Sequence, residues 1–226
     1  MAQGQTPKGG QSAPRPEVGR AVGAPVWDPL VRLSHWAVAV AVLSNYLLNR
    51  AGGTWHVWIG WGLMAVLALR FAWGFFGPQE ARFSSFLPNP FAALRHIKAL
   101  LRKLGGKRDA MPEYASHNPA GSMMIYALWA MLALVCITGL VMTGGASPVQ
   151  MAQQQAIVET GDWSTLVQAG EEVDGDGDGE DGAWAKEVHE VAANLVVILA
   201  LIHVAGVALE SRALGRNLVR PMLRKS

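Results

Sequence analysis

The sequence predicts an all-α integral membrane protein, a four-helix bundle with both termini in the cytoplasm. Three observations lead to this fold class. Apolar residues make up 51% of the 226 residues and charged residues only 16%, whereas roughly 25% are charged in a typical soluble domain. Four apolar stretches carry almost no charge, and lysine and arginine are concentrated in alternate connections. A soluble helical bundle would need polar faces at helical period, and these stretches are apolar nearly all round.

Each apolar stretch is close to the ~20 residues that a helix needs to cross ~30 Å of hydrocarbon. Single glycines are compatible with such helices, because small residues allow neighbouring helices to approach closely. We therefore expect the chain to cross a membrane four times. The predicted spans are residues 30–48, 55–76, 121–142 and 188–209.

The distribution of lysine and arginine predicts the orientation. These residues gather before the first span, in the connection 77–119 and after the last span, whereas residues 143–185 contain none. The positive-inside rule then places both termini and the basic loop 77–119 in the cytoplasm. The turn 49–54 and the acidic loop 143–186 are expected on the outer side.

The predicted organisation has one membrane domain, residues 27–215, flanked by two tails. Residues 1–26 are rich in glycine, proline and glutamine and lack an apolar core. They indicate a disordered cytoplasmic tail rather than a cleaved signal peptide. Residues 216–226 form a basic cytoplasmic tail.

The acidic outer loop contains a partial calcium-binding pattern. Residues 174–179, Asp-Gly-Asp-Gly-Asp-Gly, match the opening half of an EF-hand loop. The match then fails, because position twelve is Ala185 where a bidentate glutamate is needed. The segment 174–181 is either a calcium site or, as we favour, a disordered acidic segment that attracts a basic partner electrostatically.

Four of the six histidines, His35, His56, His189 and His203, lie in or at the ends of the predicted spans. Ionisable groups at membrane depth are costly and are therefore candidates for function. His189 and His203 are 14 residues apart, which puts them on one helix face ~21 Å apart along the axis. With the predicted orientation, His35 is level with His203, and His56 is level with His189. The four histidines thus form two pairs at two depths, each bridging two helices.

Two neutral imidazoles on facing helices suit the iron of a planar macrocycle, whereas zinc would require about four ligands. Cys136 is the only cysteine, so the chain has no CxxCH attachment site and the expected group is haem b. Two haems b at two depths would form an electron path across the bilayer. Two alternatives stay open: a mixed metal site that includes Glu187 and Glu190, and a haem-free scaffold with structural histidines.

Two arginines are candidate partners of the haem propionates. Arg70 follows His56 by 14 residues, so it shares the face of His56 and lies at the depth of the inner pair. A buried arginine needs an anionic partner, and a propionate accepts bidentate hydrogen bonds. Arg32, one turn before His35, is similarly placed. The alternatives are snorkelling to the interface for Arg70 and a lipid-headgroup anchor for Arg32.

Small residues and two further histidines complete the candidates. Gly60 and Gly206 lie one turn from a candidate ligand, where they either let a flat ring approach the backbone or serve ordinary helix packing. His96, among basic residues, indicates an amphipathic helix on the inner membrane surface. His117, ahead of the third span, is either a quinone-site residue or the residue that caps the helix start.

The sequence resembles the bacterial cytochrome b561 family, which includes the b-type cytochrome subunits of nickel–iron hydrogenases. The resemblance covers about residues 27–148 and 184–215. Taken together, its motifs are specific. They are WDPLVRLSHW from residue 27, HVWIG from 56, RFAWGFFGP from 70, ARFSSF from 81, HNPAGS from 117, TGL from 138, and His189 with HVAG from 203.

The resemblance implies a four-helix cytochrome of the bacterial inner membrane with two haems b. It implies that His35 pairs with His203 and His56 with His189 as iron ligands. Such proteins belong to respiratory electron transport and exchange electrons between membrane quinones and a redox partner outside the membrane. The long acidic loop departs from the compact members of the family, and it suggests a basic c-type cytochrome as partner.

Two alternatives to a stand-alone electron carrier stay open. One is a haem b membrane-anchor subunit of a larger oxidoreductase such as a hydrogenase. The other is a stand-alone superoxide or quinone oxidoreductase, so enzymatic activity is left open. Membrane lipid is an expected partner in every case, and nucleic acid is not.

Overall fold

The computed structural model describes residues 28–107, 114, 117–161 and 180–223. Over these residues the chain is all-helical, with seven α-helices and no strand. Four segments are long and apolar enough to cross a membrane, which confirms the four predicted spans. They are α1 (Pro29–Leu43) with the π-helical turn η1 (Ser44–Leu48), α2 (Thr54–Phe76), α4 (Pro119–Met142) and the part of α7 (Glu180–Leu214) that runs from Ala183 to Leu214.

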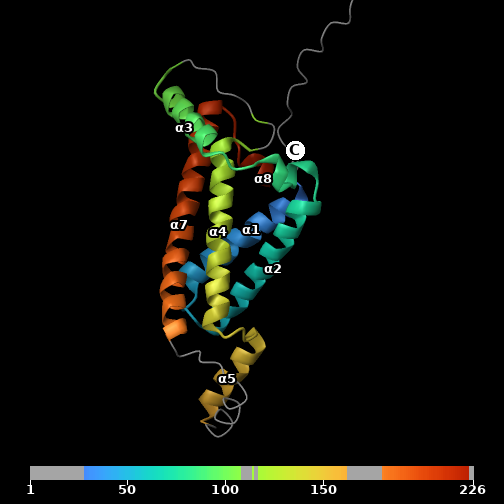
Figure 1. Ribbon diagram of the computed structural model, residues 1–226, viewed down its shortest axis with the longest axis vertical. Coiled ribbons are helices and arrows are strands. Elements are labelled where there is room, and N and C mark those ends of the chain that lie inside the picture. The colour runs from blue at the N-terminus through green and yellow to red at the C-terminus, as the bar shows by residue number, and fades with distance from the viewer. Residues whose placement is uncertain (1–27, 108–113, 115–116, 162–179, 224–226) are drawn as a thin grey trace, which may run out of the picture.

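Helices α4 and α7 run side by side along the length of the molecule, and α1 and α2 pack together beside them (Figure 1). At one end, α3 (Pro90–Leu104) packs against α4 and α7, and the short helix α8 (Arg220–Leu223) lies near the start of α1. We refer to this as the α3 end. At the opposite end, the α5 end, α5 (Pro148–Thr160) packs against α2.

Four helices begin with the same local signal, a polar capping residue followed by proline. Proline is favoured at the first helical position, where its missing N–H costs no hydrogen bond. The side chain before it accepts hydrogen bonds from the free amides of the first turn. The capping residues are Asp28 for α1, Asn89 for α3, Asn118 for α4 and Ser147 for α5.

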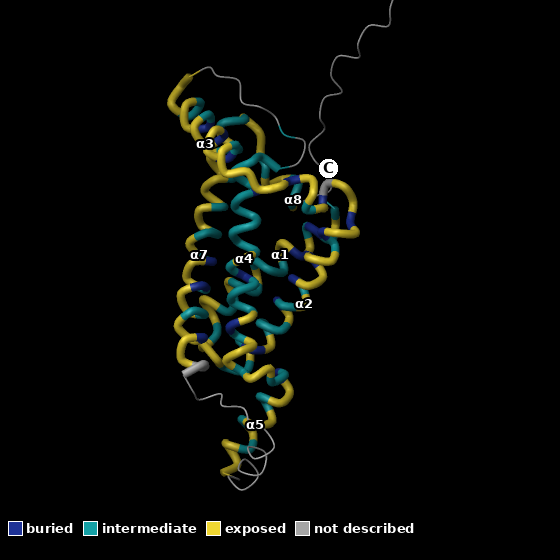
Figure 2. The backbone as a smooth tube through the Cα atoms, in the orientation of Figure 1, coloured by how far each residue is buried: buried dark blue, intermediate teal, exposed yellow. Residues whose placement is uncertain are grey.

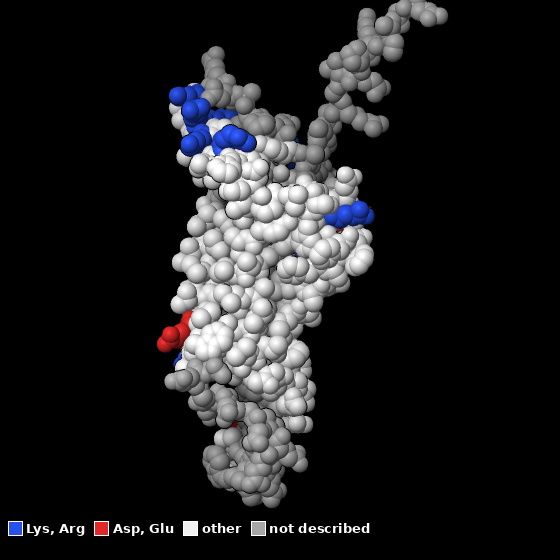
Figure 3. Space-filling view, in the orientation of Figure 1, with Lys and Arg blue, Asp and Glu red and all other residues white. Residues whose placement is uncertain are grey.

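The surface separates into an uncharged band and charged ends. Lysine and arginine side chains gather over α3, and the central part of the bundle is almost free of charge in this view (Figure 3). Large apolar side chains on the spans are exposed, among them Val40, Leu69 and Leu201. In a membrane this band contacts lipid, so its exposure costs nothing.

The buried core lies where three spans meet. Leu63 and Leu67 of α2, Leu132 of α4 and Val196 of α7 form one packed cluster. Buried positions on the tube face the inside of the bundle and alternate with exposed ones (Figure 2). Each of these side chains is at most 6% exposed, so the centre of the bundle is dry.

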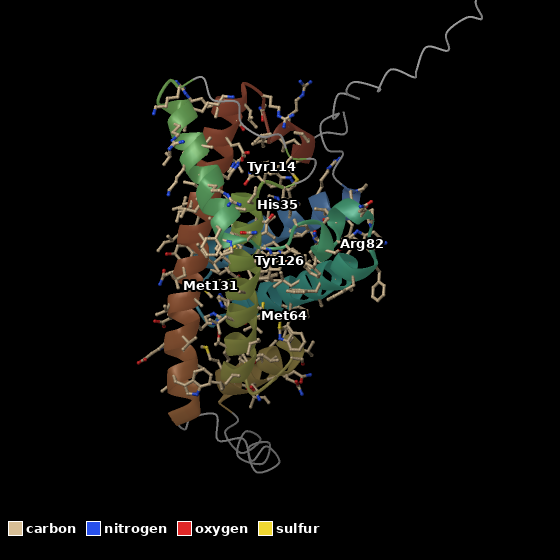
Figure 4. All side chains as sticks on the ribbon, turned by 45° about the horizontal axis from the view of Figure 1, so that its top comes forward. His35, Met64, Arg82, Tyr114, Tyr126 and Met131 are labelled. Atoms are coloured by element: carbon tan, nitrogen blue, oxygen red, sulfur yellow. The ribbon has the colours of Figure 1, made fainter. Side chains whose placement is uncertain are left out.

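An aromatic cluster packs the turn that follows α2 against α4. Phe83, in the 3-10 turn η3 (Phe83–Ser85), packs against Tyr126 and Trp129 of α4, with ring centres 6.3 and 5.1 Å away. A side chain added at Gly74 would overlap the Phe83 ring, at 2.3 Å. Glycine is therefore required at this close approach. Tyr126 is labelled in Figure 4 at this level of the bundle.

Two boundaries differ from the sequence prediction. The expected loop 143–186 contains α5, which is shorter and more polar than a membrane span and whose start is marked by the Ser147 capping box. The helix of the fourth span, α7, begins at Glu180 and ends at Leu214, beyond both ends of the predicted span. The tail 1–26 and residues 174–179 of the calcium pattern lie outside the described residues.

Candidate functional site: two histidine pairs

The structure brings the four membrane histidines together as two pairs. His35 of α1 faces His203 of α7, with ring centres 6.4 Å apart. His56 of α2 faces His189 of α7, with ring centres 6.1 Å apart. Each pair joins two spans, and α7 contributes to both.

The two pairs lie at different levels of the bundle. His189 and His203 are separated by 14 residues of continuous helix, which corresponds to ~21 Å along the axis. Val196, halfway between them, is 4% exposed and belongs to the buried core. A dry apolar layer therefore separates the pair near the α5 end from the pair near the α3 end.

The ring separations fit a shared metal ion. A metal–imidazole nitrogen bond is about 2.0 Å long and the ring centre lies about 1.1 Å behind the nitrogen, so two imidazoles on opposite sides of one ion have centres about 6.2 Å apart. The observed separations are 6.4 and 6.1 Å. The planes are inclined by 54° and 62°, and each ring can turn about its bond to the ion. Both separations thus fit two imidazoles that would hold one metal ion between them.

The donor set favours a macrocycle over a bare metal ion. In the part of the chain that the structure describes, no group of three or more histidine, cysteine, aspartate or glutamate side chains comes together. Glu187 and Glu190 are exposed rather than gathered with His189. Each pair therefore offers two imidazoles, a donor set that would suit a porphyrin iron, whereas structural zinc needs about four ligands.

Thr138 determines which nitrogen of His189 is free to bind a metal. The hydroxyl of Thr138 donates to the carbonyl of Leu134 at 2.8 Å. Nδ1 of His189 lies 3.0 Å from the same hydroxyl oxygen. With the hydroxyl hydrogen directed to a main-chain carbonyl, we assign this oxygen as the acceptor and the ring proton to Nδ1, which leaves the lone pair of Nε2 available. A second partner of this kind orients a histidine ligand and raises its basicity.

Thr138 and the next residue border this ring. Thr138 is 1% exposed, so its hydroxyl is held in a fixed place. A Cβ added at Gly139 would lie 3.4 Å from Cε1 of His189, an ordinary van der Waals distance, so glycine is not required there. Thr138 of the TGL motif therefore positions His189, a role that sequence reasoning did not assign.

The glycines near the other ligands border open space. A Cβ added at Gly60 or Gly206 would meet no other described residue within 4 Å. Close helix packing, one of the two explanations offered by the sequence, therefore does not account for them. Gly60 is part-buried and Gly206 is exposed, so the space beside them opens to the surface of the bundle, and a flat macrocycle beside each ligand would fit there.

The start of α2 is held in place by η1. Asn45 donates from Nδ2 to the carbonyl of His56 at 3.1 Å. The hydroxyl of Tyr46, in the same π turn, donates to the side-chain oxygen of Asn194 on α7 at 2.9 Å. This turn thereby connects the helix that carries His56 to the helix that carries His189. Single π turns inside helices are common at functional sites.

Arg70 is buried, at 8% exposure. Its two terminal nitrogens each lie 3.4 Å from the carbonyl of Ala81, and its guanidinium stacks 5.1 Å from the ring centre of Trp129. The carboxylate of Asp28 also interacts with its charge. Because both hydrogen bonds to the Ala81 carbonyl are long, the Arg70 guanidinium has N–H donors available for another partner. The predicted contact with a haem propionate stays a prediction.

Arg32 borders a groove between α1 and α8. The groove has a volume of about 420 Å³ and is lined by Pro29, Arg32, Leu33, Trp36, Met222 and Leu223. The Nε atom of Arg32 is buried and has no hydrogen-bond partner among the described residues. Trp36 donates to the carbonyl of Met222 at 3.2 Å and packs edge-on against His35, with ring centres 5.4 Å apart. The groove is therefore one side chain away from the His35–His203 pair.

The other two histidines take no part in the pairs. α3 is amphipathic and basic, as expected for the helix that carries His96, and His96 lies on its inner face, 3% exposed. His117 does not cap α4, because Asn118 does so. The His117 ring packs on Phe86, 4.6 Å between centres, and burial together with the charge of Arg70 lowers its pKa to about 4.

A comparison with protein families agrees with the site geometry. The model of the prokaryotic cytochrome b561 family matches residues 26–225, which include both histidine pairs and all four spans. The chain belongs to the prokaryotic cytochrome b561 family. Comparisons with curated proteins and with solved structures found no match.

Membership of the cytochrome b561 family defines the general function. This cytochrome b561 is a multi-pass membrane protein that binds haem b and transfers electrons. Haem b is not covalently attached, so side chains of the protein would have to hold it in place.

Proposed function

We propose that this cytochrome b561 binds two haems b and carries electrons across the bacterial inner membrane between the quinone pool and a periplasmic redox partner. His35 and His203 hold one haem, and His56 and His189 hold the other. The observation that carries the proposal is the pair of ring-centre separations, 6.4 and 6.1 Å. Both fit two imidazoles that share one metal ion, and neither pair has a third protein ligand among the described residues.

The orientation is proposed from the charge distribution. The basic face of α3, shown in Figure 3, lies at the same end of the bundle as the His35–His203 pair and α8. Cytoplasmic segments of membrane proteins carry an excess of lysine and arginine. The α3 end is therefore the cytoplasmic end in our proposal, and the His56–His189 pair faces the periplasm.

The protein residues provide what electron transfer requires. When bound, haem b supplies a one-electron couple that side chains lack. Thr138 keeps His189 in the tautomer that presents Nε2. The core of Leu63, Leu132 and Val196 excludes water between the two levels. Arg32 and Arg70 supply donors for propionates near the cytoplasmic pair, where their positive charge would otherwise be costly.

The quinone is proposed to bind in the groove between α1 and α8. Its volume of about 420 Å³ is within the range of ligand sites, roughly 300–1,000 Å³. Leu33, Trp36 and Leu223 supply an apolar lining, and Arg32 supplies a donor for a quinone carbonyl. The contact between Trp36 and His35 places this groove next to the cytoplasmic pair. Replacing Leu33 by tryptophan should fill the groove, which lowers the rate of haem reduction by quinol while the spectrum is kept.

The periplasmic partner is proposed to be a c-type cytochrome. Glu187 and Glu190 lie beside the outer pair and are exposed. Negative charge there favours a basic partner, and such attraction weakens as salt is added. A partner reduction rate that is the same at low and high salt would contradict this assignment.

Haem quantitation tests the proposal. A reduced-minus-oxidised spectrum with pyridine haemochrome analysis should show two haems b per chain. His35→Ala and His56→Ala should each lose one haem, whereas His117→Phe, a histidine change outside the pairs, should keep both. One haem in the wild-type protein would refute the paired assignment, and none would favour a haem-free scaffold.

The same preparation separates the alternatives. A haem b anchor subunit of a larger oxidoreductase would copurify with a catalytic subunit when extracted from its native membrane under mild conditions. Steady turnover of superoxide and quinone without any added protein would favour a stand-alone oxidoreductase.

A further inference from the structure

A second cluster of polar groups lies at the α3 end, outside the histidine pairs. It joins His96 of α3, Asn118 at the start of α4 and Glu210 of α7. Nε2 of His96 lies 3.5 Å from Oε1 of Glu210. The amide of Asn118 donates to the other carboxylate oxygen of Glu210. Three helices therefore converge on one carboxylate.

The groups of this cluster are held in defined orientations. Oδ1 of Asn118 accepts from the amide of Gly121 at 2.6 Å as the cap of α4, so its Nδ2 must point to Glu210. The His96 side chain is 2% exposed and that of Glu210 is 14% exposed. A carboxylate at this depth is costly unless it is paired or takes up a proton.

The cluster is aligned with the proposed cytoplasmic haem. Glu210 follows His203 by seven residues of continuous helix, which places it on the same face, about 10.5 Å further along the axis. It lies on the side of the α3 end. An electron added at the level of His203 therefore interacts electrostatically with the Glu210 carboxylate through protein rather than through water.

Among the titratable groups of this cluster, Glu210 is the one whose protonation would change when an electron arrives at the level of His203. Burial lowers the pKa of His96, so this imidazole is neutral at pH 7. The ring of Tyr114 lies edge-on to His96, 5.6 Å between centres, and Arg216 acts on Glu210 from beyond the end of α7. The lysines and arginines of α3 other than Lys103 are exposed and lie on its outer side.

We propose that Glu210, held by Asn118 and facing His96, is a proton-uptake site that is coupled to electron transfer at the His35–His203 pair. This inference rests on the proposed haem ligation. One electron from quinol or a chemical reductant arrives at the pair, and one proton from the cytoplasmic side joins the Glu210 carboxylate. The resulting acid donates a hydrogen bond to the neutral His96 nitrogen. On oxidation, the electron leaves and the proton returns to the cytoplasmic side.

The size of the coupling follows from the separation. For unit charges about 10.5 Å apart in a medium of effective dielectric constant about 20, the interaction corresponds to an about tenfold change in proton affinity. Reduction at the level of His203 should therefore shift the proton equilibrium of Glu210 by about tenfold. By reciprocity, pH must then change the midpoint potential of this haem.

A redox titration of the purified full-length protein at pH 6 to 9 tests the inference. In the wild type, the midpoint potential of one haem should fall as pH rises. Glu210→Gln should remove this dependence, whereas Glu159→Gln, the same change at an exposed site on α5, should leave it intact. An unchanged slope in Glu210→Gln, or a wild-type potential independent of pH, overturns the proposal.

Infrared difference spectroscopy of the wild type gives a second test that needs no variant. The reduced-minus-oxidised spectrum should contain the carbonyl band of a newly protonated carboxylic acid, and its absence overturns the proposal. His96→Phe keeps a ring in the same place but removes the acceptor, so it should shift this band. A preparation without Soret absorbance would refute the haem assignment itself, which is a result distinct from a haem protein whose potential ignores pH.

Discussion

Replacement of Thr138 by valine is the sharpest test of how the protein prepares the outer site. The two side chains have nearly the same shape, and Thr138 is 1% exposed, so packing should be kept. The variant lacks the hydroxyl that accepts from Nδ1 of His189 at 3.0 Å. The buried N–H then has one acceptor fewer, and the imidazole is free to change tautomer or turn.

The expected effect follows from the lost hydrogen bond. A hydrogen bond of this kind contributes about 0.5–1.5 kcal/mol, and loss of an outer-shell partner lowers metal affinity about 10- to 100-fold. Thr138→Val should therefore release the haem of the His56–His189 pair at least about tenfold faster. Its midpoint potential should rise, because a histidine that donates a hydrogen bond from Nδ1 is the more basic ligand and stabilises ferric iron.

Haem transfer to an excess of apomyoglobin measures the release, and a redox titration measures the potential. Thr138→Ser retains the hydroxyl and should behave like the wild type in both assays. The haem of the His35–His203 pair serves as an internal reference, because Thr138 does not contact it. If Thr138→Val kept both the release rate and the potential of the wild type, the tautomer argument would be refuted.

Three further predictions concern space, packing and protonation. Gly60→Leu should lower the haem content, because the new side chain would fill the open space one turn from His56. Gly62→Leu, on the opposite face of α2, should keep the haem content. Pyridine haemochrome analysis of both variants measures this. Gly74→Ala should destabilise the protein by about 1–3 kcal/mol, seen as a lower Tm, because its Cβ would overlap the Phe83 ring. The pKa of His117 is lowered to about 4 in the folded protein. Between about pH 6.5 and 4, His117 is therefore protonated in the unfolded chain but neutral in the folded protein. Stability should therefore fall as pH decreases through that window, by up to about 3 kcal/mol, and His117→Phe, which keeps the packing on Phe86, should weaken the fall in Tm.

Much of the architecture can be predicted from the sequence because hydrophobic length is a local property. Four apolar segments long enough to span a bilayer are recognisable without any knowledge of their neighbours. The level of each membrane histidine is also predictable, because helical rise converts the 14-residue spacing of His189 and His203 into depth. The helix starts were predicted less well: the sequence offered His117 as the cap of the third span, whereas Asn118 takes that position.

The contacts between helices depended on the tertiary structure. The sequence does not show that Thr138 meets His189, because the two residues belong to different helices whose rotation is set by packing. The inward position of His96 was likewise not predictable from its basic neighbours: α3 lies across the ends of α4 and α7, and this arrangement decides which face is covered. Local spacing thus determined which residues share a level, and long-range packing decided which side chains touch.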